Sequence, residues 1–157
     1  MSDADEIACV LVPLHARQLL LPGVTVAEVV RMQRIRPVKT TPDWHLGLVP
    51  WRGVIVPVLS IDHMLAEPED TIPAPRGGNA LLIMNRTRVM KGLSFYALLV
   101  RALPRMLWIS AEEMEGIDGP LASLEAGRVL VGQEEAMIPR LAFLEELVLQ
   151  HRLAPRV

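Results

Sequence analysis

The chain has 157 residues, of which 51% are hydrophobic, and its 16 basic and 18 acidic side chains give a net charge of −2. This length suits one domain, or two small subdomains that share a core. A charge so close to zero creates no field that would attract phosphate backbones or anionic lipid. No apolar run approaches the ~20 residues that cross a bilayer. We therefore expect no nucleic-acid partner and no direct insertion into a membrane.

The N-terminus and the cysteine content predict a cytoplasmic protein. Residues 1–6 are acidic where a secretory signal would be basic and then apolar. The single cysteine, Cys9, excludes an internal disulfide, which fits a reducing compartment. Because Cys9 lies in an apolar run, we expect it to be a buried small hydrophobe rather than a reactive thiol.

Short apolar runs rich in Val, Ile and Leu, separated by turn signals, predict strands in both halves of the chain. In the first half we expect strands over 7–14, 18–21, 35–38, 46–49 and 54–59. In the second half we expect them over 79–85, 93–100, 106–109, 128–131 and 136–138. These two sets of strands predict an all-β fold with a few short helices.

The segment between the two sets predicts a connector. Residues 66–79 hold three prolines and two glycines, which interrupt both strands and helices. Two capping boxes, Thr25 with Glu28 and Ser110 with Glu113, predict the starts of short helices. Apolar residues at helical spacing after position 140 predict a terminal amphipathic helix that packs on the strands.

Residues 47–61 are the most informative stretch, because Arg52 and Gly53 form a tight turn between two apolar runs. Pro57 has no N–H to donate, so the second run cannot be a central strand throughout. The apolar flanks should fix the backbone and display the guanidinium of Arg52 to another molecule. Trp51, beside the turn, is a candidate hot spot of an interface.

Patterns typical of catalysis or metal binding are missing from the sequence. The four histidines have no metal-ligand spacing, and neither a nucleophile elbow nor a phosphate-binding loop occurs. We therefore expect no enzyme, no metal and no cofactor. Two alternatives remain as hypotheses. One is a small β-barrel that binds nucleic acid through the basic stretch from Arg31 to Lys39, although only 4% of residues are aromatic. The other is a hydrolase with an unrecognised carboxylate pair.

Several motifs carry a family resemblance that spans about residues 7–148. The strongest is the run Gly47-x-x-x-x-Arg52-Gly53-Val54-Ile55-Val56-Pro57-Val58. Weaker matches are Val26-Ala27-Glu28-Val29, Thr41-Pro42, the strand at 80–85 and the run 107–114. With these motifs the chain resembles the CheW-like family, the small adaptors of bacterial chemosensory arrays.

The chain departs from the family pattern at four positions. Pro50 and Trp51 replace an asparagine and a leucine before the turn, and Ser60 and Arg101 replace two aspartates. These departures indicate a divergent member, from a type IV pilus system or another alternative chemosensory branch. They leave open whether both of the family's usual partner contacts are retained.

The resemblance implies a single module over 6–152 without an active site. It would contain two five-stranded, SH3-like β-barrels packed on a shared core. We expect the first barrel over 18–65, the connector over 66–79, the second barrel over 80–139 and the C-terminal helix over 140–152. The N-terminal strand, 7–14, could cross over to the second barrel.

The resemblance also implies two protein partners and a location at receptor arrays, reached through protein contacts. The first barrel would contact the regulatory domain of a CheA-type histidine kinase, and a groove between the barrels would accept the cytoplasmic tip of a chemoreceptor. Glu28 and Arg52 could instead pair with each other and fix the turn. The expected protein-binding residues are Glu28, Val29, Trp51, Arg52, Gly53, Val54 and Pro57.

Overall fold

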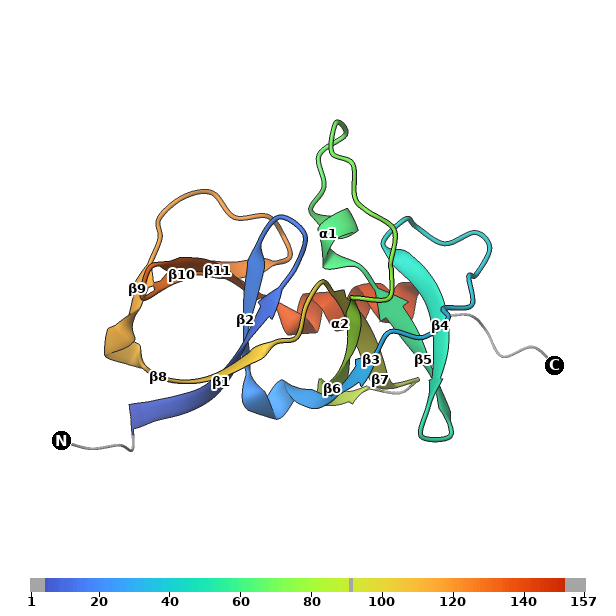
Figure 1. Ribbon diagram of the computed structural model, residues 1–157, viewed down its shortest axis with the longest axis horizontal. Helices are drawn as coiled ribbons and strands as arrows, with labels where there is room; N and C mark the ends of the chain where they lie inside the picture. Colours follow the sequence, from blue (N-terminus) through green and yellow to red (C-terminus); the bar gives the residue numbers. More distant parts are fainter. Residues whose placement is uncertain (1–4, 91, 152–157) are drawn as a thin grey trace.

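The computed structural model describes residues 5–90 and 92–151, which form two curled sheets side by side (Figure 1). The six-stranded sheet has the order β8 (Arg105–Ser110), β1 (Glu6–Pro13), β2 (Gln18–Pro22), β11 (Glu134–Pro139), β10 (Glu125–Val131) and β9 (Met114–Gly116). The five-stranded sheet has the order β3 (Val26–Arg31), β6 (Ala80–Met90), β7 (Leu93–Val100), β5 (Val54–Leu59) and β4 (His45–Trp51). The prediction of an all-β fold in two barrel-like units is confirmed, but one of the two sheets has six strands where five were expected.

The strands divide between the sheets differently from the predicted barrels over 18–65 and 80–139. β2 belongs to the six-stranded sheet, while β6 and β7 belong to the five-stranded sheet. Parallel pairs, with Leu19 opposite Met137 and Val58 opposite Ala97, bring distant segments together. The predicted boundary assumed that strands that are neighbours in sequence share a barrel. The connector 66–79 does not separate two barrels, because the strands before and after it, β5 and β6, both belong to the five-stranded sheet.

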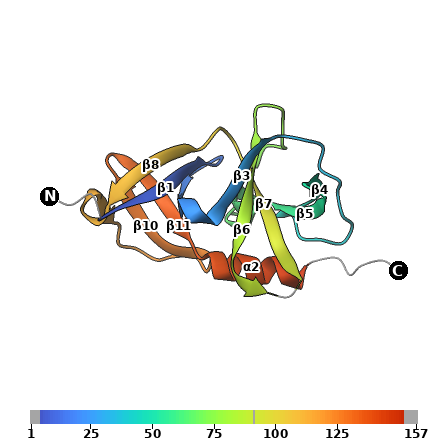
Figure 2. The same cartoon turned by 90° about the horizontal axis from the view of Figure 1, so that it is seen from below.

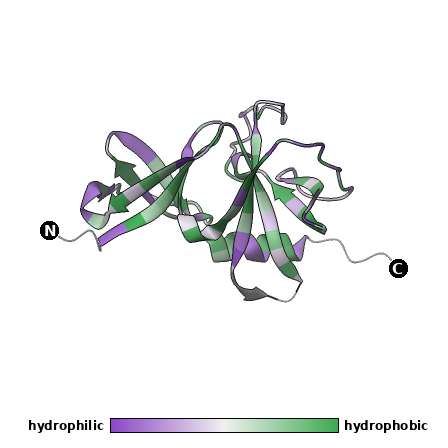
Figure 3. Cartoon of the chain, turned by 60° about the horizontal axis from the view of Figure 1, so that its bottom comes forward, coloured by the Kyte–Doolittle hydropathy of each residue, from purple (hydrophilic) through white to green (hydrophobic). Residues whose placement is uncertain are grey.

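The hairpin of β6 and β7 is buried on both of its faces, which explains this division. On one face, Leu82 and Leu98 belong to the main core, together with residues of β1, β2 and the C-terminal helix. On the other face, Leu81 and Leu99 pack inside the five-stranded sheet. A third cluster, which includes Cys9, fills the six-stranded sheet, so Cys9 is buried as expected. Figure 3 colours the ribbon by hydropathy and shows hydrophobic residues along the strands of both sheets.

The prediction of a helix after Thr25 is wrong. The 3-10 helix η2 (Gly23–Thr25) ends there, and residues 26–31 continue as β3. The hydroxyl of Thr25 donates backwards to the carbonyl of Pro22 at 2.7 Å instead of capping a following helix. β-branched valines and alternating burial along β3 favour a strand.

Two other local predictions had opposite outcomes. The strand expected over 35–38 is reduced to a single bridge between Arg36 and Leu48. By contrast, the capping box of Ser110 and Glu113 is present around the 3-10 helix η3 (Ala111–Glu113). One further short helix, α1 (Ile61–Met64), follows β5.

The C-terminal helix α2 (Leu141–Gln150) is confirmed and lies across β6 and β7 (Figure 2). Its Glu145 is fully buried. The carboxylate accepts hydrogen bonds from the Thr87 amide at 3.0 Å and from the Tyr96 hydroxyl at 3.0 Å. Burial and the nearby carboxylate raise the pKa of Tyr96 well above its usual value. These bonds satisfy a buried charge and attach the helix to the five-stranded sheet.

His45, at the start of β4, is a buried titratable group. Its Nδ1 has no hydrogen-bond partner among the described residues. Burial lowers the pKa of His45, and the charge of His151 adds to that effect. The indole of Trp44 makes an edge contact with His151, with 5.3 Å between ring centroids. The folded protein therefore favours the neutral form of His45.

We predict that acidification through the histidine range destabilises the protein because of His45. An unfolded histidine has a pKa of about 6.5, and the folded value is lower, so the unfolded state binds more protons between the two. The contribution of His45 to the free energy of unfolding, measured by urea titration, should be fully present above the unfolded pKa. It should decrease as the pH falls from the unfolded pKa toward the folded pKa. His45→Leu should flatten this dependence; an unchanged slope in the variant would remove His45 as its cause.

Candidate protein-binding site

The turn between β4 and β5 has the geometry of a tight two-residue hairpin, and it projects from the five-stranded sheet (Figure 1). Arg52 and Gly53 have φ values of 47° and 80°, and Trp51 pairs with Val54 on either side. Two consecutive positive φ values are typical of a type I′ turn, whose twist matches that of the strands. The left-handed conformation costs a non-glycine residue roughly 1–2 kcal/mol, so Arg52 needs compensating contacts.

Glu28 of β3 provides those contacts through one carboxylate oxygen. Its Oε1 accepts hydrogen bonds from Nε1 of Trp51 and Nε of Arg52, each at 3.0 Å. Nη2 of Arg52 also lies 3.0 Å from the same oxygen. The Trp51 indole, followed by the Arg52 guanidinium, lowers the pKa of the Glu28 carboxyl. The carboxylate thus stays charged and holds the edge strand and the turn together.

Aromatic packing completes the support of the turn. The Trp51 and Phe95 rings meet edge to face with centroids 4.8 Å apart, and the Arg52 guanidinium lies 5.4 Å from the Trp51 ring centroid. The Arg52 side chain nevertheless remains 70% exposed. The turn therefore presents a cation whose position is restricted but whose remaining donors face solvent.

The remaining predicted site residues differ in their exposure and in their place on the strands. Val29 and Val54 are exposed, and Ile55, which the sequence analysis did not single out, is more exposed than either. Pro57 lies inside β5 opposite Leu48, one residue before the pairing with β7 begins at Val58. A proline at this position has no N–H to donate to a neighbouring strand, which fits its place just outside the pairing with β7.

Gly47, the first residue of the signature run, permits a close backbone approach. It has a φ of 136°, and a Cβ there would lie 2.1 Å from the carbonyl oxygen of Arg36. That carbonyl accepts from the Leu48 amide at 2.8 Å, so segment 33–38 covers the outer edge of β4. Glycine at position 47 is thus a requirement of the fold beside the turn.

Three exposed apolar side chains lie in the edge strand β8 or just before it. Leu103, Met106 and Trp108 are 74%, 66% and 65% exposed. The sequence analysis considered Trp108 only as a core or rim residue, because exposure of one strand face depends on pairing that is not visible in the sequence. Leu103 also lines a hollow of about 420 Å³, together with residues 29–32 of the β3 region and residues 77–80.

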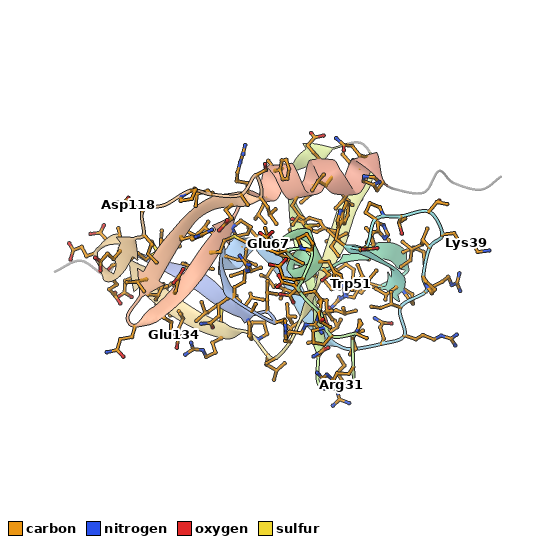
Figure 4. All side chains as sticks on the ribbon, turned by 90° about the horizontal axis from the view of Figure 1, so that it is seen from above. Arg31, Lys39, Trp51, Glu67, Asp118 and Glu134 are labelled. Atoms are coloured by element: carbon orange, nitrogen blue, oxygen red, sulfur yellow. The ribbon has the colours of Figure 1, made fainter. Side chains whose placement is uncertain are left out.

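The basic stretch lies beside a second hollow, of about 550 Å³, next to β4 and β5. Arg34 and Arg36 line it together with the aliphatic residues Pro37, Leu48, Val49, Pro50 and Ile55. This lining offers no aromatic platform on which bases could stack. In Figure 4, Trp51 and Lys39 lie on this half of the molecule, whereas Asp118 and Glu134 lie on the other half.

Residues 5–90 and 92–151 contain no group of three or more His, Cys, Asp or Glu side chains that could hold a metal ion. The same residues include no helix with the length and apolarity required to span a membrane.

Comparisons with known proteins agree with this geometry. The family described as CheW-like domain matches residues 8–144. The crystal structure of the scaffolding protein TtCheW from Thermoanaerobacter tengcongensis is similar to this fold with a TM-score of 0.72 and 20% sequence identity. The match covers 88% of this chain and 87% of that one. The comparison with curated proteins gives no match.

We predict that alanine is tolerated far less at Gly47 than at Gly53. At Gly53 an added Cβ meets nothing within 4 Å, so only the positive φ is unfavourable. Gly53→Ala should cost about 1 kcal/mol of unfolding free energy. Gly47→Ala adds the clash with Arg36 and should cost about 3 kcal/mol. Urea unfolding of both variants measures the difference, and equal losses would contradict the close approach at Gly47.

Proposed function

The chain belongs to the family of CheW-like domains, and from this premise we propose that it is a non-catalytic adaptor of a chemosensory system. In this role it holds the regulatory domain of a CheA-type histidine kinase and the cytoplasmic tip of a chemoreceptor in one geometry. The protein works in the cytoplasm and reaches receptor arrays through protein contacts. The observation that carries the proposal is the turn of Arg52 and Gly53, fixed by Glu28 before any partner arrives.

The turn supplies the kinase contact. Preformed surfaces bind with less loss of conformational freedom than flexible ones. Here Glu28 restricts Arg52 and Trp51, while Val54 and Ile55 provide exposed apolar area beside them. An exposed guanidinium next to apolar side chains suits a protein surface that offers a carboxylate and an apolar ridge.

The apolar side chains around β8 and β3 supply the receptor contact. Leu103, Met106 and Trp108 are exposed, and Val29 lies on the edge strand of the other sheet. An amphipathic helix binds such surfaces with apolar side chains spaced at i, i+3 and i+4. The helical tip of a receptor has the shape that this arrangement requires.

Signal transfer through such an adaptor needs no chemistry. If the receptor tip makes different contacts in its two signalling states, the adaptor binds those states with different affinity. The kinase held at the turn is then biased toward the state that the receptor favours. The size of that bias is limited by the difference in the two binding free energies.

We predict that Arg52→Glu weakens binding to a partner kinase regulatory domain about tenfold or more, because it places a repelled carboxylate beside Glu28 and removes the displayed cation. Circular dichroism should stay near wild type and the melting temperature should fall only slightly, since the ion pair that is lost with Glu28 is largely exposed. Pulldown followed by titration calorimetry measures the loss.

The matched control is Arg105→Glu, which breaks the exposed ion pair with Glu134 in the other sheet. This variant should leave kinase binding unchanged. Kinase binding that is equally strong with Arg52→Glu would remove Arg52 from the contact, and a collapsed fold in that variant would assign Arg52 to structure instead.

A further inference from the structure

We propose that Asp62 and Arg101 are a positioning pair that sets the receptor-facing hollow next to β3. The inference rests on the proposed adaptor function and extends it to residues that do not contact a partner. It starts from the buried ion pair between the two side chains, whose Nε and Oδ2 atoms are 3.3 Å apart. The side chains are only 11% exposed for Arg101 and 2% for Asp62.

Asp62 connects the five-stranded sheet to the other sheet. It lies in α1, directly after β5, and its two carboxylate oxygens accept from the backbone amide of His15 at 3.1 and 3.0 Å. His15 belongs to the turn between β1 and β2 of the six-stranded sheet. The carboxylate therefore receives donors from both halves of the molecule, as a buried charge requires.

Arg101, directly after β7, joins the connector to the same point. Its Nη1 donates to Oδ1 of Asn79 at 3.3 Å, and its Nη2 donates to the carbonyl of Pro73 at 3.0 Å. Its own carbonyl accepts from Nδ2 of Asn79 at 3.3 Å. Its amide donates to the carbonyl of Pro13 at the end of β1, at 2.9 Å. One guanidinium and its backbone thus join β1, β7 and the connector.

The ion pair holds residues that line the hollow beside β3, where we place the receptor contact. Asn79, which Arg101 holds by two hydrogen bonds, lines the hollow beside β3. Leu103, two residues after Arg101, lines the same hollow and is exposed. If the pair is broken, the two segments that form this wall lose their common attachment, whereas the strand β3 on the opposite wall keeps its pairing with β6.

Two of the departures from the family pattern meet in this arrangement. Ser60 is the N-cap of α1, and its hydroxyl accepts from the His63 amide at 3.2 Å. The cap fixes the first turn of α1, which carries Asp62. Asp62 in turn pairs with Arg101. The substitutions at positions 60 and 101 therefore act on one ion pair rather than independently.

The test compares Asp62→Asn and Arg101→Met with Glu125→Gln as a matched control. Glu125 is also a buried carboxylate, and it pairs with Arg128 at 2.7 Å, but it does not line the hollow. Arg101→Lys is a milder variant that keeps the positive charge near Asp62 and loses the forked contacts with Asn79 and Pro73. It keeps the test possible if the stronger variants do not fold.

The first measurement is a distance distribution by pulsed EPR between nitroxides on Leu103 and Ile55, both exposed, in a Cys9→Ala background. We expect one narrow distribution in the parent and in Glu125→Gln. Asp62→Asn and Arg101→Met should shift or broaden it, with Arg101→Lys in between. A distribution with the same centre and the same width in all variants would overturn the proposal.

The second measurement is binding of a chemoreceptor cytoplasmic hairpin to the unlabelled proteins. Asp62→Asn should weaken it about fivefold, a typical coupling between separate sites, and leave kinase binding unchanged. Equal receptor binding by Asp62→Asn and the parent would overturn the positioning role. If even the parent binds no hairpin, the proposed receptor contact fails, while the distance distributions still decide whether the pair sets the hollow.

Discussion

One carboxylate oxygen, Oε1 of Glu28, is the contact on which the displayed surface depends. It accepts from the Trp51 indole and from Nε of Arg52, and it lies 3.0 Å from Nη2 of Arg52. Without it, a left-handed arginine at the tip of a hairpin would have little to offset its backbone cost. With it, the turn, the edge strand β3 and the Trp51–Phe95 packing form one unit. The surface is therefore fixed by the fold and not by a partner.

The hairpin of β6 and β7 connects this unit to the rest of the molecule through the two cores that it shares. Because it is buried on both faces, it belongs to the core around Val49 and Val56 and to the core shared with the C-terminal helix. Glu145 attaches that helix to the same hairpin through Thr87 and Tyr96. Close-packed walls of this kind transmit displacement between their faces. Such a layout suits an adaptor that must keep two binding surfaces in a fixed relation.

The sequence predicted local features better than the arrangement of strands. The turn of Arg52 and Gly53 and the terminal helix followed from turn chemistry and helical spacing, which are local. The division into sheets was wrong because parallel pairs such as Leu19 with Met137 depend on distant segments. At Thr25, two local signals competed, and the valines of β3 prevailed. The pairing of Glu28 with Arg52 was foreseen as a possibility, but the bond from Trp51 was not, because nothing in the sequence relates positions 28 and 51.

The most direct test of the central claim is the titration of the Glu28 carboxyl carbon by NMR in the wild type, Trp51→Phe and Arg52→Met. The account predicts a pKa below the ordinary glutamate value in the wild type, because the indole and the guanidinium stabilise the charged form. It predicts that both substitutions raise that pKa. An ordinary pKa in the wild type, or one that neither substitution changes, would contradict the claim that Glu28 fixes the turn.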